Sequence, residues 1–286
     1  MSGVTRPADL ADLAWITAPA LRSHVVDTAA ELREISRATP WRVRVTERGE
    51  AVVLGRWRDH LADCAILGLW CSPHRVPLLV TDLREVAAAE GFERLVGPLV
   101  PEREATTYLD AGLRVTQRVV VMRTRPRRAP ADTGVALPVG VSLRDATADD
   151  LDAILSLDAA CFEPFWRYDA ASLSRLLDTE RIVMALLEGR FVGYTLSTLR
   201  AGEGSLGRLA VAPEARRRGI GRALALEALD RAARTGARNV VLSTQEDNAA
   251  SRALYCGIGF RETGDVLVAC STDTGTGSDR GQGVVA

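Results

Sequence analysis

The residues best suited to chemistry lie in a basic loop with two glycines, from Arg216 to Arg222. An apolar strand precedes this loop, and an Ala/Leu-rich helical pattern follows it directly. Gly219 and Gly221 let the backbone turn tightly and approach a ligand without an intervening Cβ. First-turn helix amides and the positive end of the dipole favour a phosphate or pyrophosphate. The loop lacks GxGxxG and GK[ST], so it predicts an anion site of another kind; the alternative is a solvated basic loop that caps a helix.

A second group of chemically capable residues follows between Asn239 and Phe260. A short apolar strand leads into a polar cluster, and a helix is expected to begin at Asp247 or Asn248, because both are good N-caps. Tyr255 comes seven residues after Asn248, near the end of the expected helix. This spacing indicates a polar group at each end of one helix.

Together the two segments resemble the signatures of the GNAT superfamily of acetyltransferases: the coenzyme A pyrophosphate loop, and a helix with an Asn at the cofactor and a Tyr near its sulfur. The resemblance implies acetyl-CoA as co-substrate and no metal. It also implies that the pantetheine arm pairs with a strand backbone like an extra strand. The residues implied to contact the coenzyme are Leu209, Ala210, Val211, Arg216, Arg217, Arg218, Gly219, Ile220, Gly221, Arg222 and Asn248.

The same resemblance implies direct attack of a neutral primary amine on acetyl-CoA in a ternary complex. A backbone amide near Leu209 would hold the oxyanion, and Tyr255 would protonate the departing thiolate. The alternative for Tyr255 is an aromatic that packs on the sheet. Ribosomal-protein alanine acetyltransferases, which this half resembles at CFEPFW and in the Tyr255 helix, have a glutamate where this chain has Ser243. The substitute bases are Glu163, Glu203, Glu246 and Asp247.

The acceptor and the function class stay open at this level. The resemblance implies a primary amine on a small molecule or a peptide, and Ser243 weakens the case for a peptide α-amine. The tandem arrangement is also similar to that of mycothiol synthases, whose acceptor is a small amino sugar conjugate. A non-catalytic acyl-CoA sensor or scaffold is the alternative function, since it needs the loop but no acid at Tyr255.

Composition limits the other possibilities. The chain has 286 residues, 47% of them hydrophobic and 26% charged, with a net charge of -1, which favours two globular domains and neither nucleic acid nor membrane as partner. The absence of a long apolar run and the acidic residues near the N-terminus predict a cytoplasmic protein. Five cysteines without CxxC spacing and three scattered histidines predict free thiols and no metal cluster. A homodimer is left open.

An internal repeat sets the expected architecture. Tyr108–Arg114 aligns without a gap to Tyr255–Arg261, but Cys71–Pro77 offers no glycine where the second half has its basic loop. We therefore expect an α/β protein with two tandem GNAT-like domains, each a mixed central sheet flanked by helices; the alternative is an unrelated α/β domain in the first half. The expected ranges are 1–125 for a degenerate domain without cofactor site, 126–140 for a linker, 141–270 for the catalytic domain and 271–286 for a disordered tail.

Hydrophobic periodicity predicts the elements that must position these residues. In the first half it predicts helices at 8–39 (interrupted at Pro19), 77–90 and 102–110, and strands at 41–46, 51–58, 64–71, 92–99 and 115–123. In the second half it predicts strands at 141–144, 182–187, 191–199, 206–211, 240–242 and 265–269, and helices at 147–160, at 170–177, after the glycine loop, and from Asn248.

Overall fold

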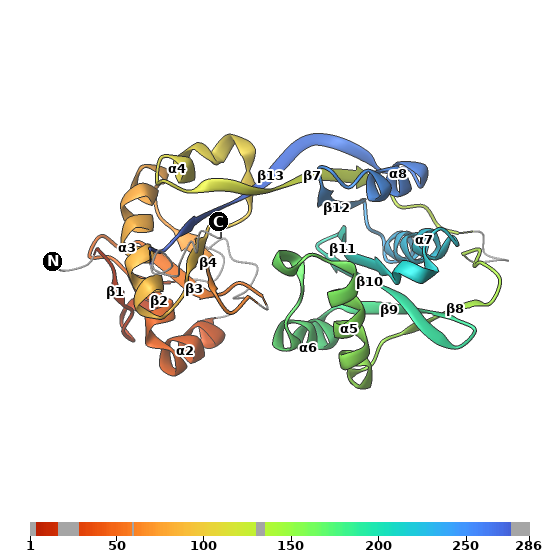
Figure 1. Cartoon of the computed structure of the whole chain (residues 1–286), viewed down its shortest axis with the longest axis horizontal. Coiled ribbons are helices and arrows are strands. Elements are labelled where there is room, and N and C mark those ends of the chain that lie inside the picture. Colours follow the sequence, from red (N-terminus) through yellow and green to blue (C-terminus); the bar gives the residue numbers. More distant parts are fainter. Residues whose placement is uncertain (1–3, 17–28, 59, 130–134, 276–286) are drawn as a thin grey trace, which may run out of the picture. The chain divides into compact units, whose positions relative to one another are not determined.

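A computed structural model describes residues 4–16, 29–58, 60–129 and 135–275. The chain divides into two compact units, one of residues 1–118 with 267–286 and the other of residues 119–266 (Figure 1). Both combine a mixed sheet with helices, as predicted. No helix in the described ranges has the length and apolar character needed to cross a membrane.

The first unit contains a sheet in the order β1-β2-β3-β4-β5-β13, and β6 also pairs with β13. All its ladders are antiparallel except that of β4 with β5. Its elements, with η for short 3-10 helices, are β1 Arg6–Pro7, α1 Asp12–Trp15, α2 Ala29–Ala38, η2 Pro40–Arg42, β2 Val43–Val45, β3 Ala51–Arg56, β4 Asp63–Trp70, η3 Pro73–Arg75, α3 Val76–Ala89, β5 Arg94–Val96, β6 Val100–Pro101, η4 Glu102–Glu104, α4 Thr106–Leu109 and the start of β7 Arg114–Thr124.

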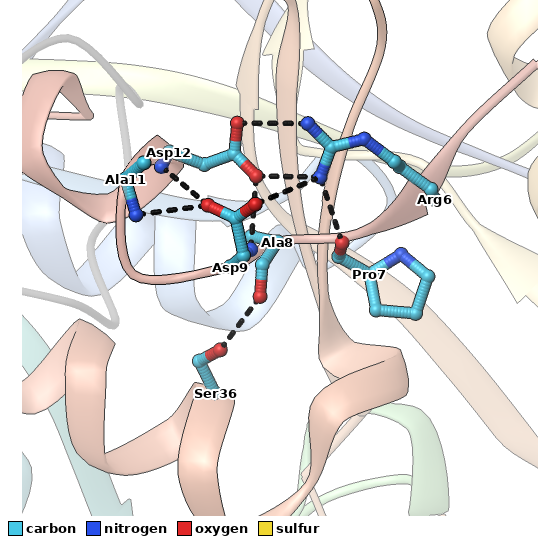
Figure 2. A network of polar contacts seen from close by, with 7 residues as sticks. All are labelled: Arg6, Pro7, Ala8, Asp9, Ala11, Asp12 and Ser36. Atoms are coloured by element: carbon cyan, nitrogen blue, oxygen red, sulfur yellow. Dashed lines mark hydrogen bonds and ion pairs between the residues drawn. The ribbon is translucent and has the colours of Figure 1, made fainter.

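A polar network fastens the beginning of the chain to this unit (Figure 2). The Arg6 guanidinium donates to both carboxylate oxygens of Asp12, at 2.6 and 3.0 Å. Asp9 accepts from the backbone amides of Ala11 and Asp12, and Ser36 donates to the carbonyl of Ala8. The two bonds to Asp9 satisfy amides that the start of α1 would otherwise leave unpaired.

The second unit contains a sheet in the order β7-β12-β11-β10-β9-β8, in which only the ladder of β11 with β12 is parallel. Its elements are β8 Val141–Asp145, η5 Ala148–Asp150, α5 Leu151–Cys161, η6 Pro164–Trp166, α6 Ala170–Thr179, β9 Arg181–Leu187, β10 Arg190–Arg200, β11 Glu203–Val211, η7 Pro213–Ala215, α7 Ile220–Arg234, β12 Asn239–Gln245, α8 Ala249–Gly257 and most of β13 Arg261–Asp273.

Strand alternation sorts the side chains of this sheet onto two faces. Ile182 and Met184 of β9 pack with the α5 and α6 residues Ile154 and Leu173 on one face. The intervening residue Val183 packs with α7 on the other face, in a separate core cluster. The amphipathic helices therefore lie where the period-two pattern of the strands requires them.

Two strands pass from one unit to the other. Residues 119–124 of β7 pair with β12 in the second unit, whereas residues 267–273 of β13 belong to the first unit, where they pair with β5 and β6. In each unit the strand beyond the parallel pair thus comes from the other half of the sequence. The sequence predicts two independently folding domains, 1–125 and 141–270, and this division stays a prediction.

Several predicted boundaries shift in the structure. β13 continues to Asp273 because its end pairs with Arg94–Val96, so the predicted tail does not begin at 271. The helix predicted over 8–39 is described at its two ends, as α1 and α2; the break predicted at Pro19, most of the tail and part of the linker lie outside the described residues. β6 was not predicted, because a strand of two residues is too short to show a hydrophobic alternation.

Candidate functional site

The glycine loop has the backbone conformation that its sequence predicts. η7 ends at Ala215, Arg217 has φ 59° and Gly219 has φ 81°, and α7 begins at Ile220. Gly219 is the N-cap of α7 and supplies no side-chain acceptor to the first-turn amides. Those amides are therefore available to an anion, at the positive end of a 15-residue helix.

Four arginines surround these amides, and all four are exposed: Arg216, Arg217, Arg218 and Arg222. Arg216 donates from Nε to the carbonyl of Val211 at 3.1 Å, and Arg222 donates from Nη1 to the carbonyl of Gly257 at 3.2 Å. Within the described ranges, none of the four forms an ion pair with a carboxylate. Their charge is thus available to a polyanionic ligand.

The linker approaches this loop as well. The amide of Ala129 donates to the carboxylate of Asp230 on α7 at 2.7 Å. At the other end of α7, a Cβ added to Gly219 would lie 3.3 Å from Cγ of Pro138. A side chain at position 219 is therefore strained by its positive φ and also pressed against the linker.

The ladder of β11 with β12 leaves an open edge beside the loop. It is limited to residues 203–205 paired with 239–241, although β11 continues to Val211 and β12 to Gln245. In the described chain, the facing edges beyond these pairs have no ladder, so backbone groups of both strands can accept an extra strand or an extended ligand (Figure 1).

The register on the other side of β11 fixes which groups face the open edge. The amide of Ala212 donates to the carbonyl of Val192, so 192 and 212 form a hydrogen-bonded pair of the antiparallel ladder. Such pairs alternate with pairs that do not bond across the ladder, and Leu209 pairs with Thr195 in one of the latter. The amides of Leu209 and Val211 therefore point away from β10 and towards the open edge.

A bulge in β11 precedes these residues. Leu196 pairs with Arg208 and Ser197 with Leu206, so Gly207 has no partner in β10. A Cβ at Gly207 would lie 3.1 Å from Cδ2 of Leu196, which disfavours a larger residue there.

α8 closes the site from the side of β12. Asn248 is its N-cap, as predicted, and its side chain accepts from the amide of Ser251 at 3.0 Å. Gly221 on α7 faces Leu254 of α8 across the open edge: an added Cβ would contact Leu209, Leu254 and Val211 at 3.5 to 3.6 Å. A Cβ alone fits at position 221, whereas a larger side chain would crowd Leu209, Leu254 and Val211.

Tyr255 lies at the end of α8, where its ring is 6% exposed and packs edge-on against Phe260 at 5.7 Å. Burial raises the pKa of Tyr255 to about 12, so its phenol is protonated throughout the neutral range. Leu206, Leu242 and Met122 belong to the same cluster. Tyr255 therefore packs on the sheet, and its part as an acid stays a prediction.

The candidate bases lie in different places. Glu203 begins β11 where β11 and β12 are still paired, at the end of the strand remote from the glycine loop. Ser243 is exposed on β12 and pairs with Val121. Glu246 and Asp247 follow β12 directly, and Glu163 begins η6. In the described ranges, no His, Cys, Asp or Glu cluster could hold a metal ion, and all five cysteines are free.

The sequence did not reveal a buried ion pair behind the site. Arg208, 7% exposed, donates from Nε and Nη2 to the carboxylate of Asp158 at 2.8 and 2.7 Å, and from Nη2 to the carbonyl of Trp166 at 2.7 Å. Its guanidinium lies 3.5 Å from the ring centre of Phe162 and 4.5 Å from that of Tyr168. Tertiary contacts alone reveal this cluster, because Arg208 is 50 residues from Asp158 and 42 residues from Trp166 in the sequence.

A cavity of about 600 Å³ lies elsewhere in the second unit. Its lining includes Ser205, Arg231 and Val240, at the paired end of β11 and the C-terminal part of α7. Neither the glycine loop nor Leu209–Val211 lines it. We therefore base the site on backbone geometry and charge.

Comparison with known proteins agrees with this geometry. Residues 151–260 match the acetyltransferase (GNAT) family. A mycothiol acetyltransferase of Clavibacter michiganensis subsp. michiganensis is 30% identical over 154 residues, which are 50% of this chain and 50% of that protein. A mycothiol acetyltransferase of Renibacterium salmoninarum is 26% identical over 199 residues, 62% of this chain and 58% of that protein. The chain thus spans about half the length of the curated relatives it matches.

Solved structures share the fold over most of the chain. A tandem GNAT protein from the clavulanic acid biosynthesis pathway aligns with a TM-score of 0.60 at 21% identity and covers 82% of each chain. A GCN5-related N-acetyltransferase from Sphaerobacter thermophilus aligns with a TM-score of 0.61 at 20% identity and covers 95% of each chain. These likenesses confirm the predicted tandem α/β architecture, and within it residues 151–260 are the part that matches the GNAT acetyltransferase family.

Proposed function

We propose that the protein transfers the acetyl group of acetyl-CoA to a primary amine. The observation that carries this proposal is the combination of uncapped first-turn amides at Gly219 with an unpaired strand edge at Leu209–Val211 in the same unit. A phosphate group needs the first feature, and an amide-bearing pantetheine arm suits the second. In the described part of the first unit, β4 likewise continues past its short parallel ladder with β5, but no glycine loop follows it: η3 runs straight into α3, and Arg75 is paired with Glu50.

Residues of the second unit would have the following roles in binding and catalysis. The loop amides and arginines hold the phosphates, and Asn248 borders the pocket. The amide of Leu209 faces the open edge and would donate to the thioester oxygen as it becomes an oxyanion. Tyr255, protonated at neutral pH, would supply the proton that the departing thiolate takes up.

Direct attack by the amine is favoured over an acyl-enzyme intermediate. The thiol of Cys161 lies beside β11 and donates to the carbonyl of Val211 at 3.4 Å. Burial raises the pKa of Cys161, so this thiol stays protonated and is a weak nucleophile. We therefore expect both substrates to be bound before reaction.

Two observations bear on the class of acceptor: the residue at position 243 and the names of similar proteins. Ser243 stands where a peptide-acetylating family has its base, which speaks against a peptide α-amine. Relatives that bear the name mycothiol acetyltransferase favour a small-molecule amine such as an amino sugar conjugate. We propose an acceptor of that small-molecule class.

Calorimetry and a thiol-release screen test the proposal. We expect one acetyl-CoA per chain and thiol release that rises with one class of small amine in a panel that also contains alanine-ended peptides. Initial rates should give intersecting lines in double-reciprocal plots, because both substrates bind before reaction. Two equivalent sites, or no binding, would contradict the proposal.

A non-catalytic acyl-CoA sensor is the second candidate. It is favoured by Ser243 in place of a base and by the packing of the Tyr255 ring in the core. Tight binding of acetyl-CoA without amine-dependent thiol release from any member of the panel would support the sensor and exclude the enzyme.

A further inference from the structure

The peptide unit that joins Arg208 to Leu209 is held on two sides. The hydroxyl of Thr195 donates to the carbonyl oxygen of Arg208 at 2.9 Å, and the Thr195 side chain is fully buried. The side chain of Arg208 is fixed separately by Asp158 and by the carbonyl of Trp166. Residue 208 is therefore fixed through both its backbone and its side chain.

This peptide unit carries the amide proposed to stabilise the oxyanion. The carbonyl of Arg208 and the N–H of Leu209 belong to one conjugated group, whose atoms lie in a plane. The carbonyl accepts from Thr195 inside the sheet, whereas the N–H faces the open edge. An amide whose oxygen accepts a hydrogen bond in a buried setting is polarised, so its N–H becomes a stronger donor.

We propose that Thr195 is a positioning residue, which orients the Leu209 amide and strengthens it as an oxyanion donor. The proposal rests on the proposed function, because it assigns a part to a buried residue behind the acetyl site. Packing alone does not account for this hydroxyl: valine has nearly the same shape, yet a threonine lies in an apolar strand between Tyr194 and Leu196.

The first test reads the electronic effect without an acceptor. Acetyl-CoA labelled with carbon-13 at the thioester carbonyl is bound to the full chain, and the carbonyl stretch is recorded by infrared difference spectroscopy. Donation by the Leu209 amide should lower this frequency relative to free acetyl-CoA. In Thr195→Val the frequency should move part of the way back towards that of free acetyl-CoA. In Thr195→Ser, and in the control Thr198→Val on the same strand, it should stay at the wild-type value.

The second test is kinetic. Acetyl-CoA hydrolysis without amine passes through the same oxyanion, so Thr195→Val should lower kcat roughly two- to tenfold, the scale of one neutral hydrogen bond, with KM for acetyl-CoA unchanged. Thr195→Ser should restore kcat, which a defect in folding or packing would not allow.

The outcomes separate the two proposals. An identical carbonyl shift and an equal kcat in the wild type and in Thr195→Val, both binding acetyl-CoA, would overturn the part given to Thr195 and leave the proposed function intact. A wild-type chain that does not bind acetyl-CoA would overturn the proposed function itself. If Thr195→Val does not fold, Thr195→Ser with the hydroxyl retained and Thr195→Ala with it removed provide the same comparison.

Discussion

Val121 pairs with Ser243 across the antiparallel ladder of β7 and β12. Val121 comes before the segment that the sequence suggests as a linker, yet its strand completes the sheet of the second unit. Thr263 on β13 also donates to the carbonyl of Val121 at 3.3 Å. The second unit therefore needs residues from before the linker.

This exchange predicts how fragments behave. A fragment of residues 136–266 lacks β7 and exposes the edge of β12 and the residues packed around Met122, which is fully buried. A fragment of residues 115–266 retains the strand. We expect cooperative thermal unfolding from the longer fragment and aggregation or a broad transition from the shorter one, measured by circular dichroism and light scattering. Equal cooperativity of the two fragments would show that β7 is dispensable.

The sequence predicts most of the fold because its strands and helices are strongly periodic. β9 alternates between two cores, and Thr147 with Asp150 forms a capping box at the start of the helix predicted over 147–160. The exchange of β7 and β13 was not predicted, because period and turn signals do not say which of two similar sheets a strand joins.

The site was predictable where function depends on backbone conformation. Gly219 has the positive φ that its place in the loop indicates, and Asn248 caps its helix. Arg208 was missed because its partner Asp158 is 50 residues away, and Thr195 was missed because its bond to the carbonyl of Arg208 depends on the register of β10 and β11. Tyr255 had two interpretations; the structure confirms its packing and leaves its chemistry to experiment.

Gly219→Ala should weaken acetyl-CoA binding at least tenfold, which is about 1.4 kcal/mol. A side chain at φ 81° is strained and would press on Pro138, so the first-turn amides would be displaced. Gly189→Ala is the matched control, because Gly189 has φ 79° and no atom within 4 Å of its added Cβ. Calorimetry should show normal affinity for this control. Equal affinity in both variants would exclude the loop from binding.

Gly221→Val should also weaken acetyl-CoA binding, by a different route. Gly221 is in helical conformation, so strain is small, but an added side chain enters the space between Leu209 and Leu254. Competition with desulfo-coenzyme A should show the loss, while circular dichroism shows an unchanged helix content. Unimpaired binding would mean that the ligand does not use the open edge.

Arg208→Met should destabilise the protein by roughly 3–5 kcal/mol, because it leaves the carboxylate of Asp158 buried without its cation. Adding Asp158→Asn should restore part of this loss by removing the buried charge. Arg144→Met breaks an exposed pair with Asp150 and should cost at most about 1 kcal/mol. Urea unfolding of all four proteins measures the differences. A double variant less stable than Arg208→Met would contradict the electrostatic account.

Tyr255 should make the protein labile to alkali. Burial raises the pKa of Tyr255 from 10.0 to about 12, so the folded state keeps a proton that the unfolded state releases. The stability contributed by the protonated Tyr255 is fully present below about pH 10. It is lost as the pH rises towards 12, by up to roughly 3 kcal/mol. The difference in unfolding free energy between the wild type and Tyr255→Phe should therefore be constant below pH 10 and change above it. Burial also raises the pKa of Cys64 to about 12, but this effect is common to both proteins and cancels. A difference that does not vary with pH would place the phenol in contact with solvent.

Tyr255→Phe should lower turnover with the acceptor amine by roughly 10² to 10⁴, the usual scale for a positioned acid, and leave acetyl-CoA affinity little changed. The ring stays packed on Phe260 in this variant, because phenylalanine loses only the hydroxyl. Tyr108→Phe is the matched control: Tyr108 is 7% exposed, at the equivalent place in the first unit, where no glycine loop precedes it. Stopped-flow detection of the released thiol compares the three proteins at neutral pH. If Tyr255→Phe turns over at the wild-type rate, the thiolate takes its proton from water and Tyr255 serves the core alone.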